Sequence, residues 1–222
     1  MTIRSHGDGS AKRGGATQRQ PLEITSAELT TRYDRGQLIL ALLAPPPMTR
    51  VVLLDPSPAW PHHFQSAAAE LHPLFPAPTF HLEHIGSTSV PDLPAKPILD
   101  LLLGAPDLAS IEAKIPRLTA LGYRYKPEHE REIPERRYFS RPAAADAPAI
   151  HLHAVVHGAA LWRDHLAFRD ALRSDPALTR AYAELKRDLA ALYAGDRAAY
   201  SDAKGPFIAE VLTRLHATHP PT

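Results

Sequence analysis

A glycine-serine pair and a later aspartate are the residues of this chain best suited to chemistry. Gly86 and Ser87 follow a predicted strand, and Asp100 lies inside the next apolar run. Glycine lets a ligand approach the backbone, and the hydroxyls of Ser87 and Thr88 with nearby free N–H groups can hold a phosphate. A carboxylate in an apolar strand is costly unless it is paired or binds a cation. Asp100 and Lys96 are therefore candidate catalytic residues, and a plain turn hydrogen-bonded to Asp100 is the alternative.

Two histidines on a later predicted strand offer further ligands. His151 and His153 alternate with Leu152, so both imidazoles project from one face of the strand. If that face meets Asp100 and His84, the set suits zinc, manganese or iron better than magnesium, because imidazole is a borderline ligand. Contact with a substrate phosphate and purely structural hydrogen bonding are the alternatives for these histidines.

An arginine pair opens another predicted strand. Arg136 and Arg137 precede Tyr138 there. A guanidinium fork matches a phosphate or a carboxylate, so we expect Arg137 to bind an anionic substrate. An ordinary arginine on an edge strand is the alternative.

Three further basic residues lie on predicted helices. Arg169 and Lys186 are expected to pair with neighbouring carboxylates such as Asp170 and Glu184. Lys204 falls within the last predicted helix and is expected on its solvated face.

The predicted elements mix strands with helices and then become wholly helical. Strands are expected over 50–54, 79–85, 97–103, 123–126, 136–141 and 149–156. Helices are expected over 26–43, 61–75, 107–121, 161–172, 178–189 and 197–216. This order favours an α+β fold with a C-terminal helical layer over a strict alternation of strands and helices.

The composition of the 222 residues narrows the class of protein. Lys and Arg total 25 and Asp and Glu total 24, which argues against a nucleic-acid partner, and no aromatic-basic RNA motif is present. The absence of cysteine excludes disulfides, thiolate metal sites and cysteine nucleophiles. No apolar run approaches the roughly 20 residues of a membrane span, and no signal peptide is recognisable. We therefore expect a cytoplasmic protein with no membrane partner, and its oligomeric state stays open.

The chain divides into three parts by composition. Residues 1–20 are rich in Gly, Ser, Arg and Lys and are expected to be disordered. Residues 21–49 are expected to form a helical extension that ends in a proline-rich linker. Residues 50–217 are expected to form the folded domain.

Several motifs, in one order along the chain, resemble those of GrpB-family proteins. They lie at 54–61, 84–91, 95–98, 151–156, 168–173 and 182–186. The similarity implies a nucleotidyltransferase-like fold, a small mixed sheet flanked by helices. GrpB-type domains occur alone and fused to dephospho-coenzyme A kinase.

The resemblance also implies roles for individual residues. In nucleotidyltransferases a Gly-Ser pair grips nucleotide phosphates and three carboxylates hold two magnesium ions. Gly86 and Ser87 match the phosphate grip, and Asp100 matches the first carboxylate. The second carboxylate position is Leu102, and the later strand offers two histidines instead of the third. A strict two-magnesium site is therefore not expected.

The leading hypothesis is a transferase-type enzyme that acts on a nucleotide or another phosphorylated or carboxylated small molecule. A nucleoside triphosphate and a divalent metal, magnesium, manganese or zinc, are the candidate cofactors. The alternative is a non-catalytic nucleotide- or metabolite-binding module that has lost the full carboxylate set. Asp100→Asn separates the two, because only an enzyme would lose turnover.

Overall fold

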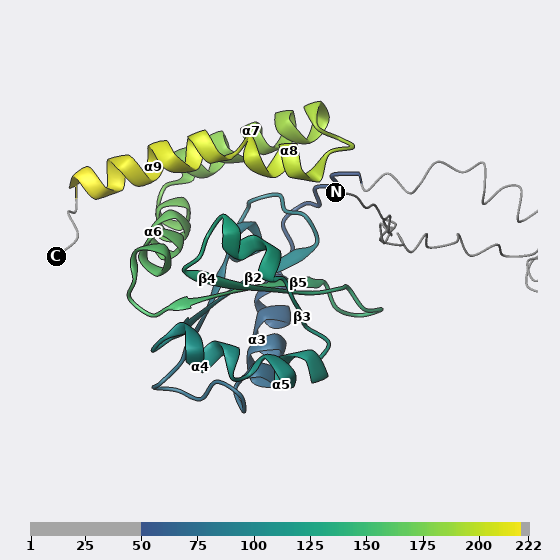
Figure 1. Cartoon of the computed structure of the whole chain (residues 1–222). Coiled ribbons are helices and arrows are strands. Elements are labelled where there is room, and N and C mark those ends of the chain that lie inside the picture. The colour runs from purple at the N-terminus through teal and green to yellow at the C-terminus, as the bar shows by residue number, and fades with distance from the viewer. Residues whose placement is uncertain (1–49, 219–222) are drawn as a thin grey trace, which may run out of the picture. The chain divides into compact units, whose positions relative to one another are not determined.

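A five-stranded mixed sheet lies between helices in residues 50–218, the part of the chain that the computed structural model describes (Figure 1). The predictions for residues 1–20 and 21–49 lie outside this range. The strands are β1 (His81–Ile85), β2 (Ile98–Ala105), β3 (Arg124–Tyr125), β4 (Arg136–Arg141) and β5 (Ala149–Val156). The helices are α3 (Trp60–Leu71), α4 (Leu108–Glu112), α5 (Ile115–Ala120), α6 (Ala160–Ser174), α7 (Pro176–Leu192), α8 (Arg197–Asp202) and α9 (Gly205–Thr218). Two short 3₁₀ turns are η1 (Ser87–Ser89) and η2 (Pro127–Arg131).

The strand order of the sheet is β1-β2-β5-β4-β3. The central strands β2 and β5 run parallel, and the other neighbours are antiparallel. In the β2–β5 register, Asp100 lies opposite His151, and Leu102 lies opposite His153. The register therefore brings together residues that are some fifty positions apart in the chain.

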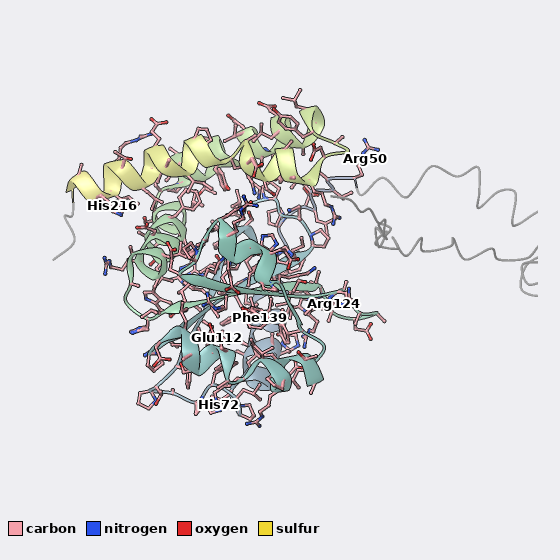
Figure 2. The ribbon with its side chains drawn as sticks, in the orientation of Figure 1. Arg50, His72, Glu112, Arg124, Phe139 and His216 are labelled. Atoms are coloured by element: carbon pink, nitrogen blue, oxygen red, sulfur yellow. The ribbon has the colours of Figure 1, made fainter. Side chains whose placement is uncertain are left out.

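The main hydrophobic core lies on one face of the sheet, under α3, α4 and α5 (Figure 1). Leu99, Leu101, Leu103 and Leu152 point into it and have no exposed surface. Phe139 of β4, labelled in Figure 2, is buried in the same core. Each such side chain contributes about 1.5–3 kcal/mol by leaving water. The other face of β2 and β5 is left to α6 and the C-terminal helices, where the polar residues of these strands lie.

Two predicted helices are each broken in two by proline. The helix predicted over 107–121 forms α4 and α5, with Pro116 in the first turn of α5. The helix predicted over 197–216 forms α8 and α9, and Pro206 lies in the first turn of α9. Proline lacks an N–H group and collides with the preceding turn, so each helix must restart. The second break places Lys204 in a turn.

The strand predicted over 50–54 is not part of the sheet. Leu54 forms only an isolated antiparallel bridge with Ala95. The backbone N–H of Val51 instead donates to the carbonyl of Ala194, at 2.8 Å. This segment connects the loop before β2 to the end of α7.

Aspartates begin two helices of the C-terminal layer. The side chain of Asp175 accepts hydrogen bonds from the N–H groups of Ala177 and Leu178, and Pro176 occupies the first helical position of α7. Asp196 caps α8 in the same way. An aspartate cap of this kind contributes about 1 kcal/mol.

The predicted α+β fold with a C-terminal helical layer is confirmed.

Within residues 50–218, no helix has both the length and the apolar character that crossing a bilayer requires.

Candidate functional site

The bend after β1 holds its backbone directly against Asp100. Gly86 has a φ of 68°, a left-handed value that glycine adopts without strain. A Cβ atom added at Gly86 would lie 2.8 Å from the Cβ of Asp100 and closer still to its carboxylate. Both the conformation and the close approach therefore require glycine. The Oγ of Ser89 donates to the carbonyl of Gly86, at 2.7 Å, and closes the turn. The predicted proximity of Gly86, Ser87 and Asp100 is present.

The carboxylate of Asp100 faces the two histidines of β5. Its Oδ1 lies 3.4 Å from Nδ1 of His151 and 3.7 Å from Nε2 of His153, and its side chain is 27% exposed. Burial raises the pKa of Asp100, but the interactions with His151 and His153 outweigh it and hold the pKa below its ordinary value. Burial lowers the pKa of His153 in spite of Asp100. Asp100 is thus an ionised hydrogen-bond acceptor.

Lys186 reaches the same site from α7 and holds the bend in place. Its Nζ donates to Oγ of Ser87, at 2.7 Å, and also to the carbonyl of Pro94. The residue is only 2% exposed. Burial, followed by the charge of Lys204, lowers the pKa of Lys186 to about 7. A buried ammonium is therefore held between two neutral oxygens.

Two more lysines converge on Tyr200 of α8. The Nζ atoms of Lys96 and Lys204 lie 5.4 Å and 4.8 Å from the centre of its ring. Burial lowers the pKa of both, and that of Lys204 falls to about 8, with the charge of Lys96 as the next cause. The aromatic face stabilises these cations where water is scarce.

Arg136 provides a fourth cation, from β4. Its guanidinium lies 5.2 Å from the centre of the Tyr138 ring, and its Nη1 lies 3.4 Å from Nδ1 of His153. Its Nε is buried and has no hydrogen-bond partner among residues 50–218. The hydrogen-bonding capacity of this N–H group is therefore not used within the described part of the chain.

These groups surround one pocket of about 760 Å³, which we call the Asp100 pocket. Its lining includes Ser87, Lys96, Asp100, Arg136, His151 and Lys204. His153 and Lys186 also line it. Its volume is within the range of about 300–1,000 Å³ that is typical of small-molecule sites.

Two of the predicted site residues, His84 and Thr88, lie outside this pocket and satisfy each other. Nε2 of His84 is 3.0 Å from Oγ1 of Thr88, and the His84 ring stacks on Phe64 with centroids 4.9 Å apart. His84 pairs with Leu101 and not with Asp100, so it faces the other side of the sheet. Burial lowers the pKa of His84 to about 4.

The predicted metal set is therefore not assembled. His84 is separated from Asp100 by the sheet, and the second carboxylate position is Leu102, which is fully buried. Within residues 50–218, no group of three or more histidine and carboxylate side chains is placed to hold a metal ion. The residues do not fit the two-magnesium arrangement of nucleotidyltransferases.

Arg137, which the sequence predicts to bind an anionic substrate, does not line the Asp100 pocket. Its guanidinium lies 2.7 Å from Glu112 and 3.4 Å from Glu130, outside the Asp100 pocket. Successive residues of a strand point to opposite faces, so only one of the two arginines can face the pocket. Arg136 is that residue.

Two lysines of the pocket have other surroundings than the sequence predicts. Lys186 does not pair with Glu184, because it lies on the buried stripe of α7 that also contains Thr179, Tyr182 and Ala183. Its spacing of four residues from Tyr182 is the signal that places it on this face. Lys204 is not on a solvated helix face, because the proline break turns it inward. The predicted pairing of Arg169 with Asp170 is present, at 2.7 Å.

Known proteins are similar to this chain over most of its length. A UPF0157 protein of Pseudomonas aeruginosa is 37% identical over 175 residues, which are 78% of this chain and 71% of that protein. The crystal structure of the conserved protein GrpB from Enterococcus faecalis matches with a TM-score of 0.66 and 29% identity, over 76% of this chain and 99% of that one.

A more distant relative is named dephospho-CoA kinase, from Mycobacterium leprae. It is 25% identical over 188 residues, 73% of this chain but only 45% of that protein. The family model described as GrpB protein matches residues 50–214. The chain belongs to the GrpB family.

Proposed function

We propose that the chain is a transferase-type enzyme that binds a nucleotide or another phosphorylated or carboxylated small molecule in the Asp100 pocket. One observation carries the proposal. Lys96, Lys186, Lys204 and Arg136 converge on a pocket in which Asp100 is the carboxylate in contact with the strand histidines. Buried positive charge without matching negative charge favours an anionic ligand.

The charge balance of the pocket supports an anionic substrate. Arg197 is a further lysine- or arginine-type side chain of its lining. Apart from Asp100, the carboxylates of the lining are Glu132 and Asp202. Glu132, Asp202 and Arg197 are all exposed, so water screens them. The cations nearest to Asp100 are better protected from water and act more strongly on a ligand.

Each residue has a role that its surroundings support. The N–H groups and hydroxyl near Gly86 and Ser87 are the candidate phosphate contacts, since glycine allows close approach. Lys96 and Arg136 would stabilise negative charge that develops during transfer. The low pKa of Asp100 makes it a weak base, so it is better suited to orienting a hydroxyl by accepting its hydrogen bond. Lys186 fixes Ser87 and adds positive charge.

The proposal does not depend on a metal ion. Leu102 occupies the strand position of the second carboxylate, and lysine and arginine nitrogens provide the positive charge that magnesium provides elsewhere. The relative named dephospho-CoA kinase supports a phosphorylated substrate only through association, because the match spans 45% of a protein whose name denotes phosphoryl transfer.

The direct test is calorimetric titration of the full chain with ATP and with tripolyphosphate. We expect both to bind, and Lys204→Met to weaken both. Lys126→Met is the matched control, because Lys126 pairs with Glu128 at 3.4 Å and does not line the pocket. Absence of binding of either anion would contradict the proposal, as would equal losses in the two variants.

A non-catalytic binding module is the second candidate function. The observation that favours it is the buried Leu102 at the place of the second carboxylate. Release of phosphate or pyrophosphate from nucleoside triphosphates by wild type and Asp100→Asn separates the two functions. Turnover that the substitution abolishes supports the enzyme, whereas binding with no turnover in either protein supports the module.

A further inference from the structure

A second pocket, of about 360 Å³, lies directly beside the Asp100 pocket. The two pockets share Ser87, Asp100, His153 and Lys204, which we call the shared wall. The second is lined mainly by apolar side chains from β1, α6 and α9, among them Ile85, Leu161, Phe168, Leu172, Ile208 and Leu212. We call it the apolar pocket.

The size of the apolar pocket is not that of a packing defect. Protein interiors leave few voids larger than a water molecule, whose share of liquid water is about 30 Å³. A pocket of about 360 Å³ is much larger, and it opens beside a carboxylate and a basic group. Its dimensions are those of a small-molecule site.

The charged side chains of the apolar pocket outside the shared wall already have partners in the protein. Asp164 lies 2.9 Å from Nε2 of His216, and Arg169 lies 2.7 Å from both Glu83 and Asp170. Both charged groups are therefore hydrogen-bonded within the protein, and the remaining lining is mainly apolar. The pocket therefore favours a neutral molecule.

His165 gives the apolar pocket a polar group of its own. Its Nε2 is buried and has no hydrogen-bond partner among residues 50–218. Its ring lies 5.5 Å from that of His153, next to the shared wall. Burial lowers the pKa of His165 to about 3, so the imidazole is neutral at physiological pH. A buried polar atom without a partner is costly, and a ligand hydroxyl would satisfy it.

We infer that the apolar pocket binds a second small molecule, a neutral one with an apolar body and one hydroxyl group, beside the anion in the Asp100 pocket. The apolar body would contact Phe168, Ile208 and Leu212, and the hydroxyl would lie near His165, at the side of the pocket that faces the shared wall. This inference rests on the proposed function, because the second molecule is the acceptor that a transferase requires.

The experiment measures binding of two fluorinated probes to the full chain by fluorine NMR. The first is para-trifluoromethylbenzyl alcohol, and the second is para-trifluoromethyltoluene, which lacks the hydroxyl. We expect both to bind, and the alcohol to bind more tightly. Ile208→Phe is expected to weaken both about tenfold, because the larger ring occupies the pocket. Leu192→Phe is the matched control, since Leu192 is 70% exposed and outside the pocket.

His165→Phe tests the polar contact with little change in shape. We expect it to remove the preference for the alcohol, while para-trifluoromethyltoluene continues to bind. Failure of both probes to bind the wild type, or equal effects of Ile208→Phe and Leu192→Phe, would overturn the inference. An unchanged preference in His165→Phe would overturn the assignment of the hydroxyl.

Tripolyphosphate separates this inference from the proposed function. Saturating tripolyphosphate should leave probe binding in place, because the two ligands occupy neighbouring pockets. Competitive displacement of the probe by tripolyphosphate would overturn the second site. If the probe binds and tripolyphosphate does not, the proposed function fails while the apolar pocket stands. If tripolyphosphate alone binds, the apolar pocket fails by itself.

Discussion

Arg169 of α6 and Lys186 of α7 are both buried cations, but the protein treats their charges in opposite ways. Arg169 donates to Glu83 and to Asp170, each at 2.7 Å. Burial lowers the pKa of Arg169, but these hydrogen bonds outweigh it and raise the pKa overall. Lys186 donates to neutral oxygens of Ser87 and Pro94, and its pKa falls to about 7.

Under the proposed function, this difference separates a structural cation from one that binds a ligand. Arg169 with Glu83 and Asp170, which we call the Arg169 cluster, is complete without any added molecule. Among residues 50–218, Lys186 forms no ion pair with a carboxylate, although it is almost fully buried. Leaving a buried charge unpaired costs stability, and such charges concentrate at functional sites. An anion that enters the Asp100 pocket would provide the missing partner.

The largest effect is expected from Lys186→Met. The substitution removes the buried charge and keeps most of the side-chain volume. Tripolyphosphate should bind on the order of a hundredfold more weakly, since losing a desolvated charge contact costs about 2–5 kcal/mol. The free energy of unfolding should fall little or rise, because the unpaired ammonium no longer has to be buried. Calorimetry and urea denaturation measure the two quantities.

Arg169→Met is the control for that experiment, and unchanged tripolyphosphate affinity is expected for it. If Lys186→Met also keeps its affinity and instead unfolds the protein, Lys186 is a structural cation like Arg169.

The pH dependence of tripolyphosphate binding is expected to follow the protonation of Lys186 and not that of the Arg169 cluster. Above pH 7 the lysine must take up a proton to hold the anion, so affinity should fall about tenfold per pH unit. In Lys186→Met the decrease should begin nearer pH 8, where Lys204 titrates. Titration with tripolyphosphate from pH 6 to pH 9 measures this, with wild type and variant in parallel.

Stability without ligand should change with pH in the opposite direction. The pKa of Lys186 is about 7 in the folded chain and near its ordinary 10.5 when unfolded. Between these values the unfolded state binds more protons, so the free energy of unfolding rises with pH. A rise that persists in Lys186→Met would assign the effect to other groups.

The same two residues show what the sequence can predict. The partner Asp170 is adjacent to Arg169, so their pairing was predictable, whereas Ser87 lies 99 positions from Lys186. The local patterns of β4 and β5 predict both strands with their observed bounds. The Gly-Ser bend and Asp100 were predictable because their strands are consecutive. The position of Lys204 in the pocket depends on the helix break at Pro206, which the pattern of apolar residues does not show. Whether Arg136 or Arg137 faces the pocket depends on which face of β4 meets α4.

A smaller effect is expected from Arg169→Met itself, on stability only. Its partners Glu83 and Asp170 have side chains that are 39% and 57% exposed, so water would solvate them after the substitution. The free energy of unfolding should therefore fall by about 1–2 kcal/mol, less than the 3–5 kcal/mol typical of breaking a fully buried pair. Urea denaturation measures it. Asp170→Asn should cost less, and a loss of tripolyphosphate affinity in either variant would contradict the separation of the two regions.

The smallest effect is expected from removal of divalent metal. Lysine and arginine provide the positive charge of the Asp100 pocket, so dialysis against EDTA should change tripolyphosphate affinity by less than about twofold in metal-free buffer. Calorimetry on the same preparation before and after dialysis measures this. A large loss that added magnesium or zinc restores would mean that a metal holds the anion. Lys186 would then not be the partner of the ligand, and its contrast with Arg169 would reflect only local packing.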